Sequence, residues 1–202
     1  MLTRLKNLFS GPQAWPVETF GKLPCYQDYI SLVTTKASVH WRDCLLAQFR
    51  GDTLPPEGLW PFVFQHRKND LLVVGLIQAS SDGLREFPFS LFVACDTKML
   101  SSPAGLTAIW GELKALHWQL LAAPDIQGVY GCCAGRKVAL DPEQSGGSGA
   151  QGQKGLLHQP GSWPRLLIAG PGNDSALHLV WQGGMAQEEF ERNWQGLKPP
   201  QP

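Results

Sequence analysis

Hydrophobic runs bounded by glycine, proline and polar turns predict the strands of this chain. Three such runs follow one another, "GLWPFVFQ", "LLVVGLIQA" and "FPFSLFVAC". The polar turn "HRKND" joins the first two and the compact loop "SSDGLRE" joins the last two, so we expect residues 59–65, 71–78 and 87–95 to be successive antiparallel neighbours. "VETFGKL" predicts an earlier strand that ends at Pro24, and "PRLLIAG" and "ALHLVW" predict a hairpin around "PGNDS".

Hydrophobic residues at helical spacing predict three helices. The first lies between Thr35 and Gly51, and the second has Ser102 as its N-cap and Pro103 at its first position. The predicted buried face of the second helix is Leu106, Trp110, Leu113, Leu116 and Leu120. A short helix is expected in "MAQEEFERNW". Hairpin strands with helices before, between and after them predict an α/β fold, a single-domain layered sandwich whose mixed, largely antiparallel central sheet is flanked by helices.

The length of 202 residues suits one domain with a sizeable core. We interpret residues 1–14 as a loosely attached N-terminal lead-in and residues 15–198 as one α/β domain. Residues 143–155 are rich in glycine, serine and glutamine, which predicts a flexible loop. The segment after this loop is too short to bury a core of its own, so the loop is expected to lie inside the domain.

The charge balance excludes some classes of partner. Lys and Arg number 17, as do Asp and Glu, so the formal net charge is zero. Broad electrostatic binding to nucleic acid or to an anionic membrane needs a basic excess, which this chain lacks. A neutral chain associates with partners more readily than a highly charged one. The eight tryptophans suit a core or a protein interface, and composition does not separate the two.

The sequence predicts a cytoplasmic protein that does not insert into a membrane. "MLTRLKNLFSGPQ" lacks the apolar run of a signal peptide, and the longest apolar run, "LLVVGLI", is far too short to cross a bilayer. The five cysteines are an odd number, and Cys132 and Cys133 are adjacent. Neighbouring cysteines bridge each other only with strain, so all five are interpreted as free thiols in a reducing compartment.

Motifs for nucleotides, metals and cofactors are weak in this sequence. "FGKLP" and "AGPGNDS" lack the paired glycines and the lysine that open a helix in a phosphate-binding loop, so both are interpreted as turns. His40 and Cys44 are four residues apart on a predicted helix, but a closed zinc site needs four ligands. No cofactor and no metal site is predicted.

Cys25 is the candidate nucleophile for an enzyme. It follows Lys22 and precedes Asp28, and a neighbouring lysine can lower the pKa of a thiol. A thiol enzyme also needs a base, and no histidine can be assigned to Cys25 from sequence. A structural cysteine is therefore favoured, and a small cysteine-dependent hydrolase or transferase is the alternative.

The loop between Ser80 and Ser90 contains a second polar cluster. Asp82 and Arg85 are three residues apart across a glycine, so a tight turn would let them form an ion pair that fixes the loop. Alternatively, the guanidinium would bind a carboxylate or phosphate of a partner. Pro88 is compatible with the start of a strand.

Taken together, "GKLP" followed by "DY" and the later "SSDGLREFP" resemble two motifs of the TagF (ImpM) family of proteins associated with bacterial type VI secretion. Gly21, Lys22, Leu23, Pro24, Asp28 and Tyr29 match the first motif, and Ser81, Asp82, Arg85, Phe87 and Pro88 match the second. Gln27 stands where the family has glycine, and the loop between Asp82 and Arg85 is one residue shorter. Trp41 falls in the region of a tryptophan-rich helix, and "LHLVW" is similar to a late strand of the family.

This resemblance implies a non-catalytic regulator without a cofactor. Some members repress assembly of the secretion machine after translation, together with a forkhead-associated scaffold protein, which would be the partner here. A fixed structural accessory of the machine is a further alternative. Because the two motifs are far apart in sequence, a shared site predicts that Asp82 and Arg85 contact each other or the turn from Gly21 to Asp28. If Arg85 is not part of the interface, exposed tryptophans such as Trp15 or Trp194 are the next candidates.

Overall fold

A computed structural model describes residues 13–49, 54–67, 70–97, 103–140, 162–170 and 173–197. Seven strands form one sheet in the order β3-β2-β6-β5-β4-β8-β9, and β1 pairs with β7 in a separate small sheet. The elements in chain order are β1 (Gln13–Pro16), β2 (Glu18–Leu23), β3 (Tyr26–Leu32), α2 (Lys36–Gln48), β4 (Trp60–Gln65), β5 (Leu72–Gln78), β6 (Phe89–Cys95), α3 (Pro103–Leu121), α4 (Ile126–Cys133), β7 (Lys137–Leu140), β8 (Arg165–Gly170), β9 (Asn173–Gln182) and α6 (Gln187–Gln195).

The strand pairing predicted for the middle of the chain is confirmed. β5 lies between β4 and β6 and is antiparallel to both, with Gly75 opposite Phe62 on one side and Phe92 on the other. β8 and β9 form the predicted hairpin, and β8 also pairs antiparallel with β4. Adjacent strands of the large sheet are antiparallel throughout, whereas the prediction was a mixed, largely antiparallel sheet. The predicted α/β class is therefore confirmed.

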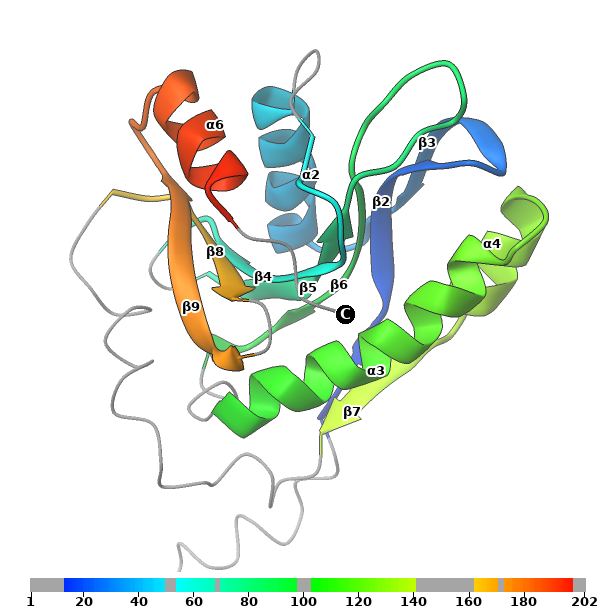
Figure 1. Cartoon of the computed structure of the whole chain (residues 1–202). Coiled ribbons are helices and arrows are strands. Elements are labelled where there is room, and N and C mark those ends of the chain that lie inside the picture. The colour runs from blue at the N-terminus through cyan, green and yellow to red at the C-terminus, as the bar shows by residue number, and fades with distance from the viewer. Residues whose placement is uncertain are drawn as a thin grey trace, which may run out of the picture.

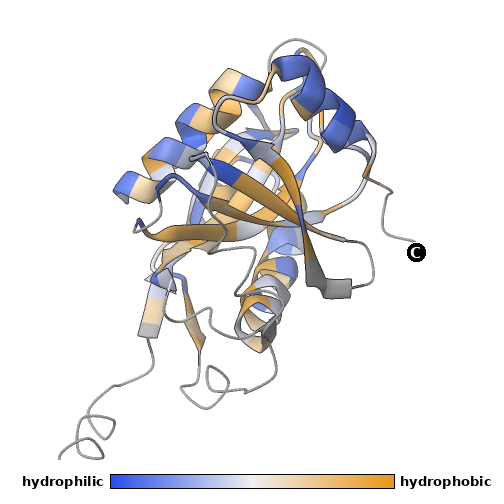
Figure 2. Cartoon of the chain, turned by 90° about the vertical axis from the view of Figure 1, so that its left-hand side faces the viewer, coloured by the Kyte–Doolittle hydropathy of each residue, from blue (hydrophilic) through white to orange (hydrophobic). Residues whose placement is uncertain are grey.

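Helices cover both faces of the large sheet (Figure 1). α2 and α6 lie on one face, where Trp41, Phe190 and Trp194 pack with the aromatic side chains of β4. α3, α4 and the small sheet lie on the other face, where Trp110 is fully buried. The hydrophobic strands run between these two layers in Figure 2. One sheet thus serves two hydrophobic cores, which explains why β4, β5 and β6 are buried along nearly their whole length.

The helix predictions are confirmed where the structure describes them. Thr35 caps α2, its hydroxyl accepting a hydrogen bond from the Ser38 N–H at 3.1 Å. The predicted inner face of α3 is buried as expected, at Leu106, Trp110, Leu113, Leu116 and Leu120. Ser102, the predicted cap of α3, lies outside the described residues. None of the described helices is both long and apolar enough to span a membrane.

Three parts of the structure differ from the predictions. β1 begins at Gln13, so the last two residues of the predicted lead-in, 13 and 14, belong to a strand paired with β7. β3, β7 and the short helix α4 were not predicted. The prediction that Trp194 is exposed is wrong, since it is fully buried on the inner face of α6. Trp15 is half-buried, whereas Trp118 on α3 is 62% exposed. The predicted flexible loop at 143–155 lies outside the described residues.

Candidate functional site

The two motif segments are brought together by the pairing of β2 with β6. Gly21 lies on β2 with a φ of +135°, a conformation that favours glycine. A Cβ at this position would lie 2.1 Å from the carbonyl oxygen of Pro88 and 2.7 Å from the Cα of Phe89. Glycine is therefore required here for two reasons, the backbone angle and the close approach of the segment that leads into β6. In the fold, Gly21 at the start of the first motif therefore lies against Pro88 at the end of the second motif.

A buried ion pair joins the motifs at their centre. The Lys22 ammonium donates to Asp82 Oδ2, and the side chains of both residues are fully buried. Lys22 Nζ is also 3.5 Å from the carbonyl oxygen of Gln27 and 4.7 Å from the centre of the Tyr29 ring. A buried charge needs such compensation, because removal from water is costly. The lysine of the first motif and the aspartate of the second therefore form one structural unit.

Asp82 also organises its own loop. Its Oδ1 accepts hydrogen bonds from the backbone N–H groups of Leu84 at 2.9 Å and Arg85 at 2.7 Å. The hydroxyl of Ser81 accepts from the Gly83 N–H at 3.0 Å. The hydrogen bond from Lys22 and those two N–H groups hold the pKa of Asp82 well below its usual range, against the opposing effect of burial. The carboxylate therefore stays ionised and keeps the loop in a tight turn.

Arg85 lies at the surface of this loop, with a side chain that is 59% exposed. One guanidinium nitrogen donates to the carbonyl oxygen of Gln27 at 2.8 Å and lies 3.6 Å from Asp82 Oδ2. The predicted contacts of Asp82 and Arg85 with each other and with the turn after Gly21 are thus confirmed. Gln27, which replaces the glycine usual in the motif, contributes through its backbone carbonyl.

Three aromatic rings pack beside the ion pair. Tyr29 stacks on Phe20 with ring centres 5.6 Å apart, and meets Phe87 edge-on at 4.9 Å. Phe20 and Phe87 also meet edge-on, at 6.0 Å. Offset-stacked and edge-on rings are favourable geometries for aromatic pairs. The aromatic positions of both motifs therefore have a packing role, and Tyr29 in addition faces the Lys22 ammonium.

The predicted site residues divide into a buried and an exposed set. The buried set, which has little surface to offer a partner, is Gly21, Lys22, Asp82, Phe87 and Pro88. The exposed set is Pro24, Asp28 and Arg85, with Ser81 and Tyr29 half-buried. The predicted residues therefore include some that hold the two segments together inside the protein and some that lie at its surface.

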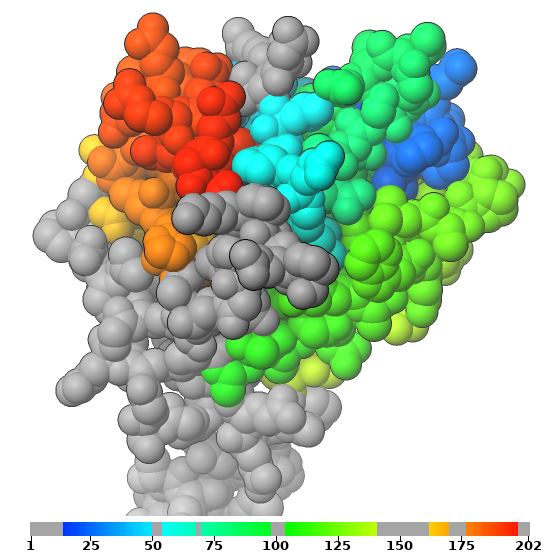
Figure 3. Space-filling model, viewed as in Figure 1, coloured from blue at the N-terminus to red at the C-terminus, as the bar shows by residue number. Residues whose placement is uncertain are grey.

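Two exposed hydrophobic side chains at the same corner escaped the sequence interpretation. Leu84, at the tip of the β5–β6 loop, is 75% exposed, and Tyr26, the first residue of β3, is 38% exposed. Figure 3 shows the atoms of these two segments, green and blue, side by side at one corner of the molecule. We call Tyr26, Asp28, Leu84 and Arg85 the motif corner. The signal for Leu84 was its position, a large apolar residue in the middle of an otherwise polar turn.

The surroundings of Cys25 do not activate its thiol. Burial is the largest effect and raises the pKa of Cys25, and the charge of Asp125 at the start of α4 raises it further. The Lys22 ammonium, the group that the sequence offered to stabilise a thiolate, is bound by Asp82. The five cysteines are unpaired in this structure.

The other candidate ligands lie apart from the motif corner. The His40 ring stacks on His66 with ring centres 3.7 Å apart. Cys44 is buried, and this burial raises its pKa far above the usual range of a thiol. Across the described ranges, no three His, Cys, Asp or Glu side chains come together in a way that could hold a metal ion.

Comparison with known proteins shows a likeness of fold. The structure is similar to the crystal structure of PA0076 from Pseudomonas aeruginosa PAO1, with a TM-score of 0.56 over 92% of this chain and 97% of that one. The two sequences are 17% identical, so the likeness concerns the fold alone. No protein-family model matches the chain, and no curated protein sequence matches it.

Proposed function

We propose that this protein is a non-catalytic regulator of bacterial type VI secretion, which acts in the cytoplasm as a post-translational repressor by binding a forkhead-associated scaffold protein. The observation that carries the proposal is the union of the two TagF-like motifs in one buried ion pair, Lys22 with Asp82. Two motifs that matched by chance would not be expected to lie in direct contact, and these two are sixty residues apart in the chain.

The geometry of the motif corner supports binding to a protein. The ion pair and the aromatic rings beside it tie the β5–β6 loop to the β2–β3 turn, and Asp82 accepts hydrogen bonds from the backbone N–H groups of Leu84 and Arg85. A backbone that is already held in place loses less conformational entropy on binding. Leu84 supplies an apolar anchor beside the Arg85 guanidinium, and arginines are enriched at protein interfaces.

The test uses the forkhead-associated scaffold encoded beside the sheath genes of the same secretion system. Replacing Leu84 by Asp is expected to weaken scaffold binding at least about tenfold, because the change places a charge where apolar area would be buried. Because Leu84 is highly exposed, the free Leu84→Asp protein should lose little stability. Arg85→Glu should weaken binding in the same direction, and its unfolding must be measured beside binding, because Arg85 also contacts Gln27 and Asp82.

A matched control lies at the opposite end of the sheet. Leu179 on β9 is 38% exposed, and β9 and β3 are the two edges of the seven-stranded sheet. Leu179→Asp makes the same chemical change and should leave scaffold binding and repression of secretion intact. A folded Leu84→Asp protein that binds the scaffold as well as the wild type does would refute the motif corner as the interface.

The cysteine-dependent alternative predicts a different result. Cys25→Ser should leave scaffold binding and repression unchanged in a regulator, because the raised pKa of the thiol disfavours the thiolate that a nucleophile needs. A folded Cys25→Ser protein that loses its effect on secretion while still binding the scaffold would instead favour an enzyme. A fixed structural accessory would be distinguished by a constant ratio to the machine in purified complexes.

A further inference from the structure

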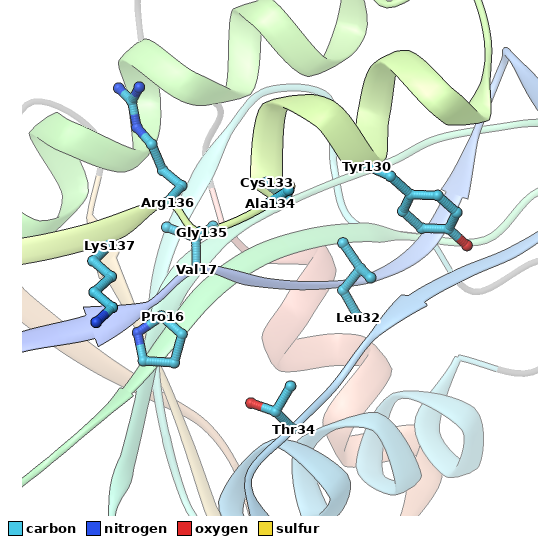
Figure 4. A pocket seen from close by; sticks show the side chains of 10 residues that line it. All are labelled: Pro16, Val17, Leu32, Thr34, Tyr130, Cys133, Ala134, Gly135, Arg136 and Lys137. Carbon is cyan, nitrogen blue, oxygen red and sulfur yellow. The ribbon is translucent and has the colours of Figure 1, made fainter.

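A second surface feature lies at the far end of β3 from the motif corner. A cavity of about 300 Å³ opens between the end of β3 and the start of β7, and is lined by residues of both strands, of β1 and of α4 (Figure 4). Since β3 is seven residues long, its two ends are about 20 Å apart. We call this cavity the β3–β7 groove. It goes beyond the proposed function, which uses the other end of the strand.

The floor of the groove is apolar and uncharged. It includes Pro16, Val17, Leu32 and Cys133, of which Val17 and Cys133 are largely buried. Burial raises the pKa of Cys133 to about 11, so its thiol is protonated at neutral pH. The backbone N–H of Val17 donates to the carbonyl oxygen of Arg136 at 3.0 Å, which fixes β7 beside this floor. The space therefore suits an apolar side chain rather than a polar group.

The margin of the groove is positively charged. Arg136 and Lys137 line it and are exposed, and Figure 4 places both on the β7 side, across the cavity from Tyr130. Neither forms an ion pair with a described residue. The described lining contains no acidic residue, and the nearby carboxylate of Glu18, which does not line the groove, accepts a hydrogen bond from the Thr34 N–H at 2.6 Å. Two free cations beside an apolar floor complement an anionic group attached to an apolar one.

We propose that the β3–β7 groove docks an acidic segment of a partner protein, which inserts one apolar side chain against Val17 and Leu32 and sets carboxylates against Arg136 and Lys137. A protein segment fits better than a small ligand, because a volume of about 300 Å³ is at the lower limit of small-molecule sites and this cavity is open to solvent. The opposite charges steer the segment to the groove, and the apolar contact holds it there.

The test uses the full-length protein and three synthetic peptides. The acidic probe has the sequence EELFEE, the basic probe KKLFKK carries the same apolar centre, and EESSEE carries the same charge without it. Backbone amide NMR spectra should show saturable shifts with EELFEE, with a Kd below about 1 mM. The shifts should concentrate on Thr34, Tyr130, Gly135 and Arg136, and the other two peptides should give none that saturate below about 10 mM.

Variants then test both halves of the recognition. Arg136→Glu should weaken EELFEE binding at least about tenfold, and raising the salt concentration should weaken binding to the wild type. Ala134→Trp should also weaken binding, because the indole would occupy the groove at its α4 side. Arg192→Glu on α6 is the matched control, with the same change of charge at another exposed arginine, and should leave binding unchanged.

Three outcomes would overturn the proposal. The first is the absence of saturable EELFEE binding at concentrations up to about 10 mM. The second is amide shifts that fall outside the groove or survive Arg136→Glu. The third is that sodium laurate shifts the same amides, saturates at a lower concentration than EELFEE does and displaces that peptide. This result would make the groove a site for a small anionic amphiphile. None of these results bears on scaffold binding through Leu84, so the two proposals fail separately.

Discussion

Lys22 shows how one side chain can decide the geometry of a whole corner. Its ammonium is fully buried and is compensated by Asp82, the Gln27 carbonyl and the Tyr29 ring. Asp82 in turn accepts hydrogen bonds from the loop that carries Leu84 and Arg85. The positions of the exposed Leu84 and Arg85 therefore depend on the Lys22 charge, which is buried and inaccessible to a partner.

Removing one member of this ion pair should destabilise the protein more than removing both. Lys22→Met leaves the Asp82 carboxylate without its main counter-charge, and we expect the free energy of unfolding to fall by about 3 kcal/mol. The double change Lys22→Met with Asp82→Leu should recover part of this loss, because no uncompensated charge remains. Urea denaturation of the wild type, of Lys22→Met, of Asp82→Leu and of the double variant measures the difference. A double variant no more stable than Lys22→Met would contradict the compensation argument.

Gly21 should tolerate no side chain. Gly21→Ala combines a φ of +135° with a Cβ placed 2.1 Å from the Pro88 carbonyl oxygen, so β2 and the segment before β6 would have to separate. We expect a loss of at least about 3 kcal/mol, or failure to fold. The matched control is Gly111→Ala on α3, where an added Cβ meets no atom within 4 Å and helix propensity favours alanine by about 1 kcal/mol. Thermal unfolding should move in opposite directions for the two variants.

At the scale of elements, α3 is tied to the sheet by a buried histidine. The Nε2 atom of His117 lies 2.9 Å from Gln78 Oε1 at the end of β5, and the ring packs near Phe89. The residue is only 1% exposed, and burial lowers its pKa to about 4. With His117 neutral, its Nε2–H donates to Gln78. Protonation of the ring inside the core is therefore unfavourable.

This histidine predicts a loss of stability in mild acid. Because the pKa is lower in the folded state than in the unfolded state, the unfolded chain takes up the proton first as the pH falls below about 6.5. The stabilisation is fully present above that pH, falls between about pH 6.5 and 4, and its loss approaches about 3 kcal/mol at the lower end. Urea denaturation of the wild type and of His117→Leu across this window isolates the effect, since His66 contributes to both proteins. Parallel curves would show that His117 titrates in the folded protein as it does in the unfolded chain.

The sequence predicted those elements whose signals are local. The runs that became β4, β5 and β6 have short polar connections and long apolar cores, so both their strand character and their pairing follow from nearby residues. β1 and β7 lack such a signal, because they are four residues each and their partners are more than a hundred residues apart in the chain. α4 was hidden by two glycines in "IQGVYGCC", which lower helix propensity, and its formation depends on the Asp125 cap and on packing against α3.

The candidate site was predictable to a similar extent. The two motifs identified Lys22, Asp82 and Arg85, and the separation of the motifs suggested that they meet. Which motif residues are buried and which are exposed was not predictable, because exposure depends on how β2 lies against β6. Trp194, which was predicted to be exposed, illustrates the same limit, since α6 places it in the core. The β3–β7 groove had no sequence signal, since α4, β1 and β3 meet there only in the fold.

For the whole molecule, the central feature is one sheet shared by two cores. Ile109 on α3 belongs to the core on one face, and Ile168 on β8 belongs to the core on the other. β5 supplies Val74 to the first core and Val73 to the second, so neither layer can leave without exposing strands that the other layer needs. The two layers should therefore unfold together, in a single cooperative transition.

Two matched substitutions test this cooperativity. Ile109→Val and Ile168→Val each remove one methylene group from a fully buried side chain, and each should lower the free energy of unfolding by about 1 kcal/mol. The residues belong to different clusters, so the double variant should lose about 2 kcal/mol, the sum of the two effects. Guanidinium denaturation followed by tryptophan fluorescence and by far-UV circular dichroism should give coincident curves for all four proteins. Two resolved transitions, with Ile109→Val shifting one and Ile168→Val the other, would show instead that the faces unfold independently and that the shared sheet does not couple them.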